Sequence, residues 1–342
     1  MKRLFLLPIF DGTLRNLAML KEQIFSISSS EEFLAAALAT FRFQHTHTAP
    51  YRKYCDLLGV NPKMVCKLED IPFLPITFFK THSVVTEGSP ATILFTSSGT
   101  TGSSTSKHYI TDESLYRESF RSTFKQYYGD PKELTILALL PSYLERTGSS
   151  LIYMVDNLIK SSHNPESGFY LDQLDTLAQN LESLDQQNKH ILLLGVSYAL
   201  LDLIEKHSFQ LKNTIVMETG GMKGKRKEMI KEELHDLLKK GFGVSQIHSE
   251  YGMTEMLSQA YSKGNGLFTC PPWLKILTRD PEDALTVIHG KTGGINVIDL
   301  ANLNSCSFIA TQDLGKTHPD SSFEILGRFD TSDIRGCNLM VD

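Results

Sequence analysis

The sequence predicts an α/β protein with layered parallel or mixed sheets, helices on both faces, and a smaller β-rich C-terminal portion. In the middle of the chain, short apolar runs alternate with amphipathic segments, which is typical of strands that alternate with helices. The apolar runs are as continuous as those of buried parallel strands. From about residue 290 the pattern changes to short strands and turns. With 342 residues, of which 41% are hydrophobic, the chain can bury a large core.

Residues 1–90 are expected to form a helical and then irregular region packed on this core. Two serine–glutamate pairs, Ser28 with Glu31 and Ser29 with Glu32, have the spacing of a capping box just ahead of the apolar run Phe33–Leu38, so either serine is a candidate helix cap. The segment Ile71–Phe79 contains two prolines and is predicted to be an extended connector rather than a central strand.

Residues 91–285 are expected to form the α/β core, which carries the candidate binding elements described below, and residues 286–342 a β-rich closing subdomain. The predicted buried strands of the core are Leu134–Leu140, Ile191–Leu194 and Ile215–Met217. Two helices are predicted from apolar residues at helical spacing: Tyr116, Phe120, Phe124 and Tyr127 in one, and Ile230, Leu234, Leu237 and Leu238, ending at Gly241, in the other.

Composition excludes several classes of function. The net charge is −5 and no block of basic residues marks a nucleic-acid or membrane surface. No apolar stretch approaches the roughly 20 residues that a membrane-spanning helix needs. The five cysteines are odd in number, scattered, and without metal-ligand spacing, so neither a disulfide framework nor a zinc site is expected. We therefore expect a cytoplasmic protein.

The segment Ile93–Gly102 is the first candidate binding element. An apolar run breaks into hydroxyl-rich and glycine-rich sequence and reaches a cation, after which a helical pattern follows. Two glycines let backbone N–H groups approach oxygen atoms, hydroxyls add further donors, and a lysine supplies positive charge, which suits a loop around a polyphosphate. The residues concerned are Ser98, Gly99, Thr100, Thr101, Gly102 and Lys107. The alternative is a plain Ser/Thr/Gly linker.

A second candidate, 248–255, follows the apolar run Val244–Ile247, where α/β proteins place ligands. Tyr251 can stack on a flat base, and Gly252 allows close approach. Thr254 can hydrogen-bond a phosphate, and Glu255 can hold a hard cation such as Mg²⁺ through its oxygens. The alternative is an ordinary turn with a glutamate in the first turn of a helix.

Three further pieces complete the set. Gly220 and Gly221 follow an apolar strand, where backbone could contact the edge of a base, although a tight turn explains the pair equally well. Asp313 follows the apolar residues Ile309–Ala310 and can accept hydrogen bonds from two ribose hydroxyls. Arg328, in the sequence Gly-Arg-Phe-Asp, carries a guanidinium suited to ribose or phosphate oxygens.

The order of these pieces resembles that of adenylate-forming enzymes: acyl-CoA synthetases, peptide-synthetase adenylation domains and luciferases. The resemblance spans about residue 93 to the C-terminus. It implies that the Ser/Thr/Gly loop and Lys107 face the ATP phosphates and that the Gly220–Gly221 turn lines the adenine. It also implies that Tyr251 stacks on the base, Thr254 meets the α-phosphate and Glu255 binds Mg²⁺, while Asp313 and Arg328 hold the ribose. The implied reaction is attack of a carboxylate on the α-phosphorus of ATP, which gives an acyl-adenylate.

A closer resemblance is to the acyl-protein synthetase family, which includes the synthetase component of the fatty-acid reductase complex of luminous bacteria. It is carried by Ile71–Lys80, Leu140–Leu151, Ser249–Glu255 and Arg335–Leu339. In that family a cysteine near the C-terminus accepts the acyl group, and Cys337 occupies the matching place. Its polar surroundings near the chain end suit an exposed thiol nucleophile rather than a core residue. The alternative is an incidental exposed cysteine.

The resemblance also has departures. The chain ends at Asp342, so the mobile C-terminal domain of most adenylate-forming enzymes is expected to be absent, and Lys107 follows a longer spacer than usual. The sequence thus predicts an ATP- and Mg²⁺-dependent acyl-protein synthetase that activates a fatty or related carboxylic acid and transfers it to Cys337. The expected partner is an acyl reductase or acyltransferase. The alternatives are a CoA ligase of the phenylacetate type and a degenerate nucleotide-binding subunit without catalysis.

Overall fold

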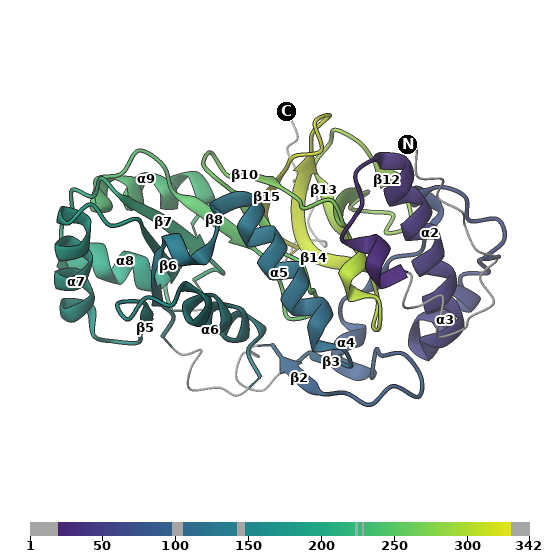
Figure 1. Ribbon diagram of the computed structural model, residues 1–342. Helices are drawn as coiled ribbons and strands as arrows, with labels where there is room; N and C mark the ends of the chain where they lie inside the picture. The colour runs from purple at the N-terminus through teal and green to yellow at the C-terminus, as the bar shows by residue number, and fades with distance from the viewer. Residues whose placement is uncertain (1–19, 98–104, 142–147, 223–224, 228, 330–342) are drawn as a thin grey trace.

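The computed structural model describes residues 20–97, 105–141, 148–222, 225–227 and 229–329. In this part of the chain a 13-stranded mixed sheet extends through the molecule, and helices lie on both sides of it (Figure 1). A separate two-stranded sheet lies at the lower edge of the same view. The predicted α/β class is confirmed.

One half of the large sheet is parallel and alternates with helices. From the edge inward its strands are β5 (Gly168–Tyr170), β4 (Thr135–Leu139), β6 (Ile191–Val196), β7 (Thr214–Thr219) and β8 (His248–Tyr251). All three predicted strands are present, and every residue of β4 and β6 is buried, as their continuous apolar sequences require. The helices of this half are α5 (Glu113–Tyr128), α6 (Ser150–Ser162), α7 (Leu174–Gln186), α8 (Ser197–Lys206) and α9 (Lys231–Phe242), and a short 3₁₀ turn spans Pro131–Glu133.

The other half is antiparallel. From β8 outward it contains β9 (Ala260–Ser262), β10 (Leu267–Thr269), β15 (Phe323–Arg328), β14 (Phe308–Thr317), β13 (Gly293–Asp299), β11 (Leu274–Arg279) and β12 (Val287–Ile288), and a 3₁₀ turn spans Leu300–Asn302. All seven residues of β13 are buried, because both faces of the sheet are covered there.

The N-terminal region packs against this antiparallel half (Figure 1). Its elements are α2 (Ser30–His47), α3 (Ala49–Leu57), a 3₁₀ turn at Leu68–Asp70, β1 (Leu74–Pro75) and α4 (Phe78–Thr81). Ser29 caps α2 as predicted, and its side chain accepts a hydrogen bond from the Glu32 amide. The predicted connector Ile71–Phe79 contributes β1, which pairs with β14.

Helix α9 differs from its prediction. Ile230 and Leu237 were expected on its buried face, but they are 65% and 43% exposed, whereas His235 is buried. The helix also continues past Gly241 to Phe242 and ends at Gly243, whose conformation is left-handed. Hydrophobicity alone could not show that His235 has a buried carboxylate, Glu218, as a partner.

The parallel and antiparallel halves meet at β8, which pairs in parallel with β7 and antiparallel with β9. The candidate residues of β7, β8, β14 and β15 therefore belong to one continuous sheet. Among the helices that the structure describes, none is both long and apolar enough to cross a bilayer.

Candidate functional site

The predicted phosphate loop connects two paired strands. Ser98, Gly99, Thr100, Thr101 and Gly102 lie outside the described residues, but the flanking strands β2 (Ile93–Thr96) and β3 (Lys107–Ile110) form an antiparallel hairpin. The Ser97 amide donates to the Ser106 carbonyl at 3.1 Å, and the Ser106 amide donates to Ser97 Oγ at 2.9 Å. These bonds close the base of the loop. A strand, rather than a helix, follows it directly.

Lys107 begins β3, and its side chain is exposed. Side chains alternate along a strand, and here His108 and Ile110 are buried while Lys107 lies on the outer face. Lys107 thus stands at the base of the Ser/Thr/Gly loop on the solvent side of the hairpin.

Tyr251, Asp313 and Arg328 come together although they are far apart in sequence. Tyr251 ends β8, and its hydroxyl donates to Asp313 Oδ2 at 2.8 Å. Asp313 on β14 stands directly opposite Arg328 on β15, whose Nε lies 3.5 Å from Asp313 Oδ1. The Asp313 side chain is 13% exposed and that of Arg328 is 74% exposed, so a shielded carboxylate lies beside a guanidinium that reaches solvent.

A second arginine supports Asp313 from inside the sheet. The guanidinium of Arg279, which is 8% exposed, donates to the carbonyls of Ile295 and Thr311. Burial raises the pKa of Asp313, while the Tyr251 hydrogen bond and the charges of Arg328 and Arg279 act in the opposite direction. The two cations therefore favour the ionised form of Asp313 against the effect of burial.

Thr254 and Glu255 lie in the turn after β8. The prediction placed the strand before His248, but the strand is 248–251 itself, and the loop begins at Gly252. No helix follows: the chain turns and returns as β9. Glu255 is therefore not a residue of a first helical turn, which removes the alternative explanation for this glutamate.

The Glu255 side chain is 5% exposed and lies among polar groups. Burial raises the pKa of Glu255, while a hydrogen bond with Ser106 and the charges of Lys80 and Arg328 lower it. A buried carboxylate of this kind gains from a nearby cation. In the described residues no three His, Cys, Asp or Glu side chains form a metal cluster, but Mg²⁺ is commonly held by one or two carboxylates together with substrate phosphates, so Glu255 fits such an ion.

The Gly220–Gly221 turn follows β7. Gly220 has φ of 67°, a conformation that favours glycine. The Ser197 hydroxyl lies within hydrogen-bond distance of two groups at this turn, 3.3 Å from the Gly220 carbonyl and 3.1 Å from Glu218 Oε2. Glu218 in turn forms a buried ion pair with Lys231 of α9.

The ion pair makes Glu218 an anion at neutral pH. Burial alone would raise the pKa of Glu218, but the charge of Lys231 and hydrogen bonds from His235, Lys231 and Ser249 lower it to about 2. The Gly220–Gly221 turn is therefore connected, through the Ser197 hydroxyl, to a buried and ionised carboxylate, that of Glu218.

The described site residues thus form two groups: Tyr251–Asp313–Arg328, and Thr254–Glu255 beside Ser106 and His108 of the β2–β3 hairpin. The charge of Arg328 acts on Glu255, which links the two groups. Cys337 lies outside the described residues. Of the other cysteines, Cys55 and Cys306 are buried, Cys270 is half-buried and Cys66 is exposed, and all four are free thiols.

A protein-family model for acyl-protein synthetases, LuxE, matches residues 17–342. The chain belongs to the LuxE acyl-protein synthetase family. It is accordingly an AMP-forming ligase, and the closer of the two resemblances stated from the sequence is confirmed. No curated protein sequence matches the chain significantly.

Solved structures share the fold of this LuxE-family chain. A 2-hydroxyisobutyryl-CoA ligase in complex with 2-HIB-AMP and CoA superposes with a TM-score of 0.66 at 15% identity, over 89% of this chain and 72% of that one. ATP-bound MatB from Rhodopseudomonas palustris superposes with a TM-score of 0.53 at 17% identity, over 71% of this chain and 49% of that one. At these identities the likeness shows the fold.

Sequence reasoning missed several polar residues that support the site of this LuxE-family member. Arg279, His108 and Asn302 are all buried, and Lys80 places its charge near Glu255. The one available signal was position: His108 directly follows Lys107 in the candidate phosphate segment. The others approach the site only through tertiary contacts between distant parts of the chain.

Proposed function

We propose that this acyl-protein synthetase activates a fatty or related carboxylic acid with ATP and then holds the acyl group as a thioester on Cys337. The observation that carries the proposal is the cluster of Tyr251, Asp313 and Arg328, in which the charge of Arg328 also acts on the buried carboxylate of Glu255. A flat aromatic ring, a shielded carboxylate, a solvent-reaching guanidinium and a metal-binding carboxylate are the groups that Mg²⁺-bound ATP needs.

In the first step a carboxylate oxygen of the acid attacks the α-phosphorus, and the bond to the bridging oxygen of pyrophosphate breaks. Tyr251 would stack on adenine against the Gly220–Gly221 turn, and Asp313 would accept hydrogen bonds from the ribose hydroxyls. Thr254 would donate to the α-phosphate. Mg²⁺ held by Glu255 would neutralise phosphate charge.

The loop would supply N–H and hydroxyl donors to the β- and γ-phosphates from Ser98, Gly99, Thr100, Thr101 and Gly102. Positive charge would come from Lys107 and Arg328. Donors and cations fixed before the reaction stabilise the charge that develops on the transferring group without reorganising solvent.

In the second step the sulfur of Cys337 attacks the acyl carbonyl, a thioester forms, and AMP leaves. A thiol loses its proton more readily than a hydroxyl and is intrinsically nucleophilic. A reducing cytoplasm keeps this thiol available. An acyl reductase or acyltransferase would then consume the thioester.

The test combines labelled fatty acid, ATP and Mg²⁺ with the purified protein, followed by treatment of the protein with hydroxylamine. We expect ATP-dependent label that hydroxylamine releases, unchanged in Cys66→Ser, a matched exposed thiol, and lost in Cys337→Ser. Equal labelling of Cys337→Ser would contradict the role of the thiol. AMP formation that depends on CoA, without protein label, would identify a CoA ligase instead.

A further inference from the structure

We propose that His108 is a positioning residue of the adenylation site, which fixes the backbone of Thr254 and Glu255 and so sets the direction of both side chains. The inference rests on the proposed function of that turn, but the contacts that carry it do not.

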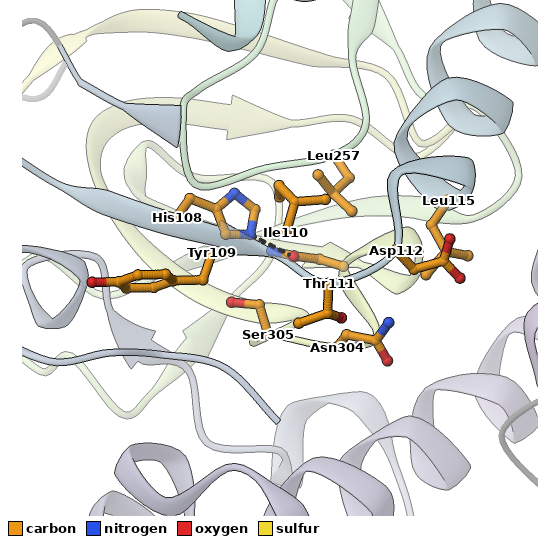
Figure 2. A pocket seen from close by; sticks show the side chains of 10 residues that line it. His108, Tyr109, Ile110, Thr111, Asp112, Leu115, Leu257, Asn304 and Ser305 are labelled. Carbon is orange, nitrogen blue, oxygen red and sulfur yellow. Dashed lines mark hydrogen bonds between the residues drawn. The ribbon is translucent and has the colours of Figure 1, made fainter. Parts of the chain in front are cut away.

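His108 is fully buried on β3 and makes two contacts with different parts of the chain. Its Nδ1 lies 2.8 Å from the Thr254 carbonyl oxygen, and its Nε2 lies 2.9 Å from Asn302 Oδ1. Figure 2 shows the ring beside β3 with the second of these bonds drawn. The edge of the ring also packs against Phe79 at 5.6 Å between centroids. The ring therefore has a polar neighbour at each of its two nitrogens and an aromatic neighbour in Phe79.

Asn302 extends this connection to the next residue of the turn. Its side-chain nitrogen donates to the Glu255 carbonyl at 2.8 Å and to the Cys306 carbonyl at 2.9 Å. Both hydrogens of the amide are therefore used, and its oxygen faces Nε2 of His108. The ring then meets an acceptor at each of its two nitrogens. Burial lowers the pKa of His108 to about 4, and a neutral ring has one N–H, so it donates to one of the two acceptors at a time. The backbone of Asn302 is itself fixed, since its carbonyl accepts from Gln44 Nε2 at 3.0 Å.

Two successive carbonyls of the turn, those of Thr254 and Glu255, are thus held from the buried side by one His–Asn pair. A fixed carbonyl prevents its peptide plane from rotating, so the side chains that follow keep their direction. Ser106, two residues before His108 and just ahead of β3, forms a hydrogen bond with the Glu255 carboxyl. The hairpin that carries the phosphate loop and the turn that carries the metal ligand are therefore joined through His108.

Three substitutions separate the contacts of the ring. His108→Ala removes both and enlarges a small pocket that already lies beside the ring, lined by Ile110, Leu257 and Ser305 among others (Figure 2). His108→Asn keeps an N–H donor near the position of Nδ1, within reach of Thr254. His108→Gln keeps one near the position of Nε2, within reach of Asn302.

The measurement is carboxylate-dependent ATP–pyrophosphate exchange against Mg²⁺ and ATP concentration, at a temperature where each variant is folded. We expect His108→Ala to lower kcat about 10- to 100-fold and to raise the Mg²⁺ concentration at half-saturation, as losses of residues that orient metal ligands do. We expect His108→Asn or His108→Gln to recover a large part of the loss. The KM for the acid should change little.

The matched control is Tyr51→Phe. The Tyr51 hydroxyl is buried and donates to the Pro72 carbonyl at 2.7 Å, so its loss also removes one buried hydrogen bond, away from the turn. The proposal is overturned if His108→Ala keeps the kcat and Mg²⁺ dependence of the wild type, if Tyr51→Phe loses kcat equally, or if neither amide variant recovers any activity.

A readout without catalysis keeps this inference separate from the proposed function. Trp273 is the single tryptophan of the chain, and its indole N–H donates to Ser119 Oγ, which lies 2.9 Å from Ser258 Oγ in the same turn. We expect His108→Ala to shift Trp273 emission and to speed amide exchange across residues 252–259 at least tenfold, while Tyr51→Phe does neither. A wild type that shows no ATP–pyrophosphate exchange with any acid would refute the proposed function alone. Unchanged Trp273 emission and unchanged amide hydrogen exchange in His108→Ala would refute the positioning role.

Discussion

Replacing Glu250 with glutamine should make the protein more stable at pH 8 but hardly more stable at pH 5. Glu250 lies on β8, is 7% exposed, and its carboxylate accepts a hydrogen bond from Thr219 on the adjacent strand. Burial and, to a smaller extent, the nearby Glu218 carboxylate raise the pKa of Glu250 to about 7. Glutamine has the same shape and cannot ionise.

The sign follows from the two pKa values. Below pH 4.5 the carboxyl is protonated in both states, and ionisation has no effect on stability. Between pH 4.5 and about 7 the unfolded chain ionises first, which lowers the free energy of unfolding by about 1.4 kcal/mol per pH unit. Above pH 7 the free energy of unfolding stays lower by a constant amount of roughly 3 kcal/mol.

The assay is urea unfolding of the wild type and Glu250→Gln at pH 5 and pH 8. The difference in free energy of unfolding should change by roughly 2–3 kcal/mol in favour of the variant between the two pH values. Glu182→Gln on α7 is the control, because it removes the same charge from an exposed position. A difference that stays constant, or that turns against Glu250→Gln as pH rises, would refute the reasoning.

Three further substitutions test other parts of the site. Asp313→Ala removes the shielded carboxylate and should raise the KM for ATP at least tenfold or so with a smaller effect on kcat, measured by pyrophosphate exchange. Glu255→Gln should raise the Mg²⁺ requirement of the same reaction by one order of magnitude or more, and unchanged Mg²⁺ dependence would exclude it as a ligand. Arg279→Met removes the buried hydrogen bonds that the guanidinium donates to the Ile295 and Thr311 carbonyls and to Asn296 Oδ1. It should lower the free energy of unfolding by roughly 2–4 kcal/mol, checked by urea titration.

Strands with local signals were the easiest part of the fold to predict. The strands β4 and β6 are almost entirely apolar, β7 contains the apolar run Ile215–Met217, and α5 places Tyr116, Phe120 and Phe124 on one buried face. Each of these patterns is complete within a short window of sequence, and burial on both faces of a sheet or on one face of a helix is sufficient to produce it.

Elements whose polar residues are buried were predicted less well. Phe242 and His235 lie on the inner face of α9, and His235 finds polar partners there on neighbouring strands: its Nε2 lies 3.2 Å from Ser249 Oγ and 3.5 Å from Glu218 Oε1. Gly293 and Gly294 lie inside β13, where a Cβ on Gly294 would come within 2.5 Å of the Arg279 guanidinium. Glycine is needed here for close approach, and nothing local in the sequence distinguishes that from a turn.

The candidate site shows the same division. Tyr251, Asp313 and Arg328 could be named because each stands in a short recognisable pattern, and the structure places them in contact. His108 and Asn302 are 194 positions apart in the chain and meet only in the folded state. A residue whose role is to hold another residue has no pattern of its own, so it can be found only from its contacts.

The turn after β8 lies where the parallel half of the sheet gives way to the antiparallel half, and this position explains why so many distant residues support it. The strand before the turn pairs in parallel with β7, and the strand after it pairs antiparallel with β8. The backbone of the turn therefore belongs to neither ladder, and its buried groups need other partners. They find them in the antiparallel half: Asp299 accepts from the amides of Leu257 and Ser258, and Asn302 donates to the carbonyl of Glu255. A turn held by side chains can keep a conformation that the hydrogen bonds of a sheet ladder would not allow. A strand reversal is therefore a suitable place for the two residues that we propose act at the α-phosphate and the metal ion, Thr254 and Glu255.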